Sequence, residues 1–147
     1  MLSRLLIIAS LAIVNACASR PFGEVSSEDF PVVNVRGKNA LLDNARISTL
    51  FNDVTAYGWY YPGNTTFIRY YGKAGRVIEL HTVKGRREGN WRVHSDQLCV
   101  NWNGQQECSV IKRENNRIGQ YQISATGKLN RIIGYERFLR GNLERLE

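Results

Sequence analysis

The sequence predicts a mainly β domain: a small antiparallel meander of about eight strands, closed into a barrel or folded into two layers, with one short N-terminal helix. Turn residues recur about every nine to thirteen positions from residue 62 onward, which is typical of short strands joined by tight turns. The intervals between the turns are rich in β-branched and aromatic residues, and several of them alternate apolar with polar positions. One hairpin, with Asn103-Gly104 at its turn, also allows its register to be deduced from the residues.

The first residues have the layout of a bacterial export signal. The apolar run from Leu5 to Val14 is too short to span a bilayer as a helix. The segment Val14-Asn15-Ala16-Cys17 resembles the lipobox of bacterial lipoproteins, a family in which the signal is cut before the cysteine and the cysteine is acylated. We therefore expect residues 1–16 to be a signal peptide and Cys17 to carry lipid. Cleavage after Ala18, as in ordinary secretion, is the alternative.

The rest of the chain divides into a tether and one domain. Residues 17–40 contain Pro, Gly and Ser without periodic hydrophobicity, which predicts a lipid-anchored tether. Residues 41–147 suffice for a single β-rich domain. From Asp43 to about Asn52 the apolar residues follow helical spacing, so we expect one short helix, capped by Asp43 or Asn44, that covers an end or a face of the sheet.

The remaining elements are expected to be strands. Along one of them, Ile78 and Leu80 share a face opposite Val77 and Glu79. We expect a glycine-flanked turn over Gly85 to Gly89. The expected strands are 54–61, 65–71, 77–83, 90–93, 98–102, 108–112, 117–123 and 131–135.

Asn103-Gly104 predicts a two-residue hairpin turn, because both central residues of a type I′ turn need a positive φ. Counting back from the turn pairs Trp102 with Gln105 and places Cys99 directly opposite Cys108. That position is a non-hydrogen-bonded pair, where the Cα atoms lie about 4.5 Å apart, within reach of a disulfide. We therefore expect a structural Cys99–Cys108 bridge that contributes roughly 2–3 kcal/mol.

The segments Gly89-Asn90-Trp91-Arg92-Val93 and Leu98-Cys99-Val100-Asn101-Trp102, followed by Cys108, resemble an uncharacterised family of small exported proteobacterial proteins. The resemblance covers roughly residues 45 to 125. It implies a fold and a compartment but no activity. A fainter likeness is to the lipoprotein inhibitors of c-type lysozyme. The positive charge of this chain argues against that role, because those lysozymes are cationic.

The charge favours anionic partners. The net charge is +7, and removal of the signal, which contains Arg4 and no acid, lowers it to +6. This positive net charge suits several anionic partners: phospholipid headgroups, lipopolysaccharide phosphates, acidic polymers and acidic proteins. We expect no nucleic acid partner, because we expect the protein to be exported. Export would place it in the cell envelope as an outer-membrane lipoprotein facing the periplasm, or, without the lipid, as a soluble periplasmic or secreted protein.

The residues indicate no catalytic chemistry. Only His81 and His94 are histidines, and neither lies in a metal-binding spacing, so we expect no metal and no cofactor. The triplet His94-Ser95-Asp96 is explained by turn chemistry, because three consecutive residues cannot form a catalytic relay. We therefore expect no enzymatic activity.

The candidate binding surface is Tyr57, Trp59, Tyr61, Arg86 and Arg87. On a strand the three rings share one face, and packing in the core is the interpretation we favour for them. If that face points outward, it forms a stacking platform for sugar rings or an anchor for a protein. The arginines, placed in a turn, are either solvated or bind anionic surfaces.

These inferences predict a non-enzymatic cell-envelope lipoprotein that acts as a binding or scaffolding module at the membrane–periplasm boundary. Its partners would be the membrane, through the lipid anchor, and anionic envelope components or an envelope protein. The alternative is a lipocalin-like carrier of a small apolar or sugar ligand, and the third possibility is an inhibitor or modulator of an envelope enzyme. An internal pocket lined by Tyr and Trp would favour the carrier, whereas a filled core with an exposed aromatic strip would favour the interaction module.

Overall fold

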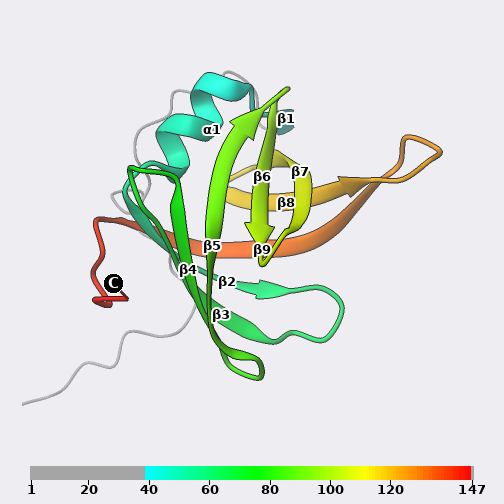
Figure 1. Ribbon diagram of the computed structural model, residues 1–147. Coiled ribbons are helices and arrows are strands. Elements are labelled where there is room, and N and C mark those ends of the chain that lie inside the picture. Colours follow the sequence, from blue (N-terminus) through cyan, green and yellow to red (C-terminus); the bar gives the residue numbers. More distant parts are fainter. Residues whose placement is uncertain (1–38, 147) are drawn as a thin grey trace, which may run out of the picture.

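The computed structural model describes residues 39–146 of the chain (Figure 1). The signal peptide, Cys17 and residues 17–38 of the tether lie outside the described residues. The elements are β1 (Asn39–Leu41), α1 (Asn44–Phe51), β2 (Val54–Tyr60), β3 (Thr66–Tyr71), β4 (Arg76–His81), β5 (Gly85–His94), β6 (Gln97–Trp102), β7 (Gln105–Glu114), β8 (Arg117–Ile123) and β9 (Leu129–Arg140). No helix among these elements is long and apolar enough to cross a membrane.

Strands β2 to β9 form a closed antiparallel barrel, which confirms the expected fold class. Each strand pairs with the next one in the chain, and β9 also pairs with β2, so the eight strands close on themselves without a free edge. A ninth strand, β1, was not expected. Asn39 and Ala40, assigned to the tether from the sequence, pair with Glu114 and Arg113 of β7.

Helix α1 covers one end of the barrel, next to β5 and β6 (Figure 1). Asp43 is the N-cap, as expected, and its carboxylate accepts a hydrogen bond from the Arg46 amide at 2.9 Å. Asn44 and Asp96 exchange side chain-to-backbone hydrogen bonds of 2.7 Å, which fasten the helix to the β5–β6 turn. Phe51 then enters the barrel, where its ring packs 4.8 Å from that of Tyr71.

The hairpin of β6 and β7 has the register deduced from the sequence. Trp102 pairs with Gln105, and Cys99 pairs with Cys108. The Cα atoms of the two cysteines are 4.0 Å apart and their sulfur atoms are bonded, so the expected bridge is present in the structure. Asn103 and Gly104 have φ of 51° and 89°, as a turn with two left-handed residues requires.

The segment from Gly85 to Gly89 is strand, and the expectation of a turn there was wrong. The β4–β5 turn is residues 82–84, and the imidazole Nδ1 of His81 shapes it by accepting hydrogen bonds from the amides of Val83 and Lys84. Gly85, whose φ is +73°, ends this turn, and its positive φ favours glycine. Gly89 is a glycine for another reason: a Cβ there would lie 2.9 Å from the Trp102 ring and 2.1 Å from a backbone oxygen.

Candidate functional site

Strand β2 separates its side chains into an inner and an outer row. Val54 and Ala56 belong to the buried core, and Tyr60 reaches the polar network inside the barrel. Because strand residues alternate, Tyr57 and Trp59 are on the outside, and both are half-buried. Tyr61, directly after the strand, packs beside Trp59, with ring centroids 6.1 Å apart. The interpretation of these three rings as core was therefore wrong, and the alternative of an outward aromatic face holds.

Tyr57 is held between two partners from the C-terminal part of the chain. The guanidinium carbon of Arg137, its neighbour across the β2–β9 ladder, lies 3.9 Å from the ring centroid. The hydroxyl donates a short hydrogen bond to Glu144. Burial and the Glu144 carboxylate raise the pKa of Tyr57 to about 12, so the phenol remains protonated.

Trp59 lies across Gly134 of β9. A Cβ at position 134 would come within 2.4 Å of the indole, so only glycine lets the ring lie against the strand. Trp59 and Gly134 are direct partners in the ladder. The indole thereby packs against the outer wall with part of its surface left to solvent.

Arg131 lies between two further rings. Its guanidinium carbon is 5.2 Å from the centroid of Tyr61 and 5.9 Å from that of Tyr121. The nitrogens Nε and Nη2 are buried and have no hydrogen-bond partner among the described residues. Its Nη1 lies 3.9 Å from Glu114, a longer ion pair than the 2.8 Å one between Glu114 and Lys112. This arginine is therefore held mainly by aromatic faces.

We call Tyr57, Trp59, Tyr61, Arg131 and Arg137 the aromatic–arginine strip. Its members come from β2, the residue that follows it, and β9, which are adjacent in the barrel wall. Tyr, Trp and Arg are the residue types that contribute most to protein–protein binding when they lie on a rigid surface. The cation–π contacts hold the rings in place, so little conformational entropy remains to be lost on binding.

The two arginines of the expected basic turn point in opposite directions. Arg86 is on the outer face of β5, where its Nη2 bonds Glu88 at 2.7 Å. Arg87 points into the barrel, where its Nε bonds Glu79 at 2.7 Å. Two strands, β3 and β4, separate β5 from β2, so neither arginine belongs to the strip. The five candidate residues therefore form no single surface.

A polar network that was not predicted from the sequence crosses the barrel interior. Gln120 donates to Ser109 at 2.6 Å and accepts from the Tyr135 hydroxyl at 2.8 Å. The Tyr135 hydroxyl lies 3.0 Å from that of Tyr71, which accepts from Arg69 at 2.8 Å. All five side chains are buried. The sequence contained one signal of a buried polar row, which was the alternation that places Glu79 on the same face as Val77.

Arg69 connects this chain of hydrogen bonds to a buried ion pair. Its Nε and Nη2 both bond Glu79, which is fully buried and also accepts from Tyr60 at 2.8 Å. Arg87 completes the group with its guanidinium 4.1 Å from the Trp102 ring centroid. Every charge in the network is thus paired or stacked, as burial requires.

The network has defined protonation states. Burial opposes the ionisation of Glu79, but the charge of Arg69 and the hydrogen bond from Arg87 outweigh it and lower the pKa below the ordinary value of 4.5. Burial raises the pKa of Tyr60 and of Tyr135, which therefore remain neutral. Glu79 and Arg69 are consequently both charged at neutral pH.

The barrel interior is filled by these polar groups and by rings. Phe51 packs within 5.5 Å of both Tyr135 and Phe138, and Phe67 lies 6.0 Å from Tyr135, measured between ring centroids. The bulky side chains that are fully buried include charged as well as aromatic ones. Two hollows lie on the outer face of β5 and β6.

Comparison with protein-family models, with curated proteins and with solved structures found no match for this chain.

Proposed function

We propose that this protein is a non-enzymatic binding or scaffolding module of the cell envelope, attached to the membrane through lipid on Cys17. The aromatic–arginine strip is its partner-binding surface. The observation that carries this proposal is the contrast between a filled barrel interior and half-buried Tyr and Trp rings on the outer wall.

The filled interior argues for this function over that of a carrier. A lipocalin-like protein needs an internal cavity for its ligand. Here Arg69, Tyr71, Tyr135 and Phe138 are bulky side chains that are fully buried. A ligand that entered would have to displace the Arg69–Glu79 ion pair, and separating a buried pair costs about 3–5 kcal/mol.

The strip favours a protein partner. Rigid aromatic rings with adjoining arginines match the residue types of binding hot spots. The exposed guanidinium of Arg137 would orient a partner that carries acidic side chains, since Asp and Glu accept hydrogen bonds from arginine. The mature charge of +6 acts in the same direction over longer distances.

The test is affinity purification of the tagged protein from envelope extracts, comparing the natural chain with the double variant Trp59→Ala, Tyr61→Ala. We expect a protein captured by the natural chain to be lost from the variant. The matched control is Val83→Ala, which removes an apolar side chain that is 74% exposed in the β4–β5 turn and should retain the partner. Equal capture by all three forms would contradict the role of the strip.

The anchor is tested separately. Cys17→Ala should release the protein from membranes at high salt while the domain remains folded, because the tethering lipid is lost and the barrel is unchanged. Sedimentation with membranes, together with a thermal melting curve, measures both properties. Continued sedimentation of the folded variant at high salt would mean that Cys17 is not the anchor.

A further inference from the structure

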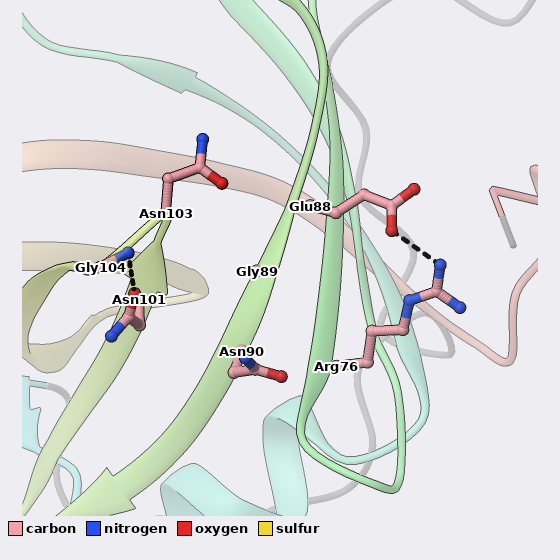
Figure 2. Close-up of a pocket in the computed structure, with 7 residues that line it drawn as sticks. All are labelled: Arg76, Glu88, Gly89, Asn90, Asn101, Asn103 and Gly104. Carbon is pink, nitrogen blue, oxygen red and sulfur yellow. Dashed lines mark hydrogen bonds and ion pairs between the residues drawn. The ribbon is translucent and has the colours of Figure 1, made fainter.

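A shallow groove crosses the outer wall of the barrel at β5 and β6, well separated in the strand order from β2 and β9. It consists of two adjoining hollows of about 430 and 260 Å³, both lined by Asn90 and Asn101. Figure 2 shows the first of these, with Asn90 and Asn101 on neighbouring strands and Asn103 at the hairpin turn. Arg92 and Gln106 line the second.

The strand register aligns the polar side chains of this groove in one row. Arg76 pairs with Asn90, Asn90 with Asn101, and Asn101 with Gln106, so the row runs over β4, β5, β6 and β7. Directly opposed residues in a ladder share one face of the sheet. At the usual spacing between strands the row is about 14 Å long, enough for an extended ligand.

The side chain of Asn90 faces solvent. Asparagine is depleted in strands, yet this one occupies the outer face of a central strand and is exposed. Its backbone belongs to the ladders with Arg76 and Asn101, but within residues 39–146 its side-chain amide has no hydrogen-bond partner. Asn101, by contrast, has a clear structural role, since its Oδ1 accepts from the Gly104 amide at 2.8 Å in the hairpin turn (Figure 2).

Positive charge surrounds the row. Arg76 and Arg86 both pair with Glu88, at 2.8 and 2.7 Å, and Arg92 donates to Gln106 at 3.0 Å. Two arginines therefore share Glu88, and the third, Arg92, lies farther along the row beside Gln106. The Arg76–Glu88 pair is exposed, with 47% and 45% of the two side chains accessible, so a ligand can reach both groups.

We propose that this groove binds an acidic polysaccharide. Amide side chains both donate and accept hydrogen bonds, which matches the hydroxyl groups of sugars, and arginine matches a carboxylate or phosphate substituent. A neutral sugar would use the asparagines alone and leave the excess positive charge uncompensated. This site is independent of the strip and of the proposed protein partner.

Titration calorimetry of the full-length protein with oligogalacturonate tests the proposal, with maltohexaose as the uncharged probe. We expect oligogalacturonate to bind and maltohexaose to bind more weakly. Asn90→Ala should weaken oligogalacturonate binding about three- to tenfold, and Arg92→Gln about tenfold, as expected for a neutral and a charged hydrogen bond. Asn130→Ala, which changes an exposed strand asparagine of β9, is the matched control and should have no effect.

Each variant must keep the melting temperature of the natural chain, which is expected because the altered side chains are exposed. Trp59→Ala should leave oligogalacturonate binding unchanged. A wrong assignment of the strip would therefore show in the capture of a protein partner, and a wrong assignment of the groove would show in oligogalacturonate binding. No binding of oligogalacturonate, equal binding of both sugars, or full affinity in Asn90→Ala would overturn the proposal.

Discussion

Neighbouring residues in this barrel can have opposite roles, because successive strand side chains point to opposite faces. Arg86 and Arg87 are the sharpest case. The first forms an exposed pair with Glu88, and the second enters the interior and bonds Glu79. Their chemistry is the same, but only Arg87 is part of a network whose other charges are buried.

This difference predicts unequal effects on stability. Arg87→Ala should lower the free energy of unfolding by about 1–3 kcal/mol, because Glu79 loses a charged hydrogen bond. Arg86→Ala should change it by less than about 0.5 kcal/mol, since an exposed ion pair contributes little. Urea denaturation of the two variants measures both values. Equal losses would contradict the inward placement of Arg87.

The buried carboxylate predicts a dependence on pH. Because the folded state lowers the pKa of Glu79 below 4.5, its contribution is complete above that pH and is lost as pH falls through the lower folded-state pKa. Glu79→Gln should therefore cost about 3–5 kcal/mol at neutral pH and progressively less in acid. The control Glu88→Gln alters an exposed carboxylate and should have little effect on unfolding at any pH. A cost for Glu79→Gln that stays constant down to pH 2 would refute the charged pair.

At the scale of elements, the packing of β2 against β9 on the outer wall depends on a glycine of β9. Trp59 can lie against the sheet only because Gly134 has no side chain. The register shift between Tyr57 and Gly58 in the β2–β9 ladder lies immediately beside this contact. The strip is therefore a property of two paired strands and not of one aromatic run.

A double-mutant cycle tests this pairing. Gly134→Ala should lower the free energy of unfolding by about 1–3 kcal/mol, because the new methyl group collides with the indole. In a Trp59→Ala background the same change should cost markedly less, since the colliding ring is absent. Thermal and urea unfolding of the four proteins provide the coupling energy. Equal costs in both backgrounds would mean that Trp59 does not lie on Gly134.

For the whole molecule, the sequence predicted the elements and the register of the disulfide hairpin better than it predicted which side chains point into the barrel. The helix, with Asp43 as one of two expected caps, and the Cys99–Cys108 register were predicted, because local turn and cap chemistry determines them. The orientation of β2 was not, because both of its faces carry apolar or aromatic residues and alternation alone does not tell inside from outside. The inward Arg87 was missed because Gly85 and Gly89 resembled two ends of one turn.

The interior network could not be deduced for a related reason. Arg69 and Glu79 are ten residues apart in the chain, and only pairing of β3 with β4 brings them opposite each other. Once paired, they fill space that a carrier would keep for its ligand. The barrel thus becomes a rigid support for its outer wall, and the proposed function is that the aromatic–arginine strip on this wall binds a partner.

Photo-crosslinking in living cells tests that claim most directly. A photoreactive phenylalanine analogue in place of Tyr61 keeps an aromatic ring in the strip, and the same analogue in place of Val83 reports on an exposed turn outside it. We expect illumination to produce a discrete protein adduct from position 61 and none from position 83. Adducts that are absent from position 61, or identical at both positions, would contradict a partner-binding strip.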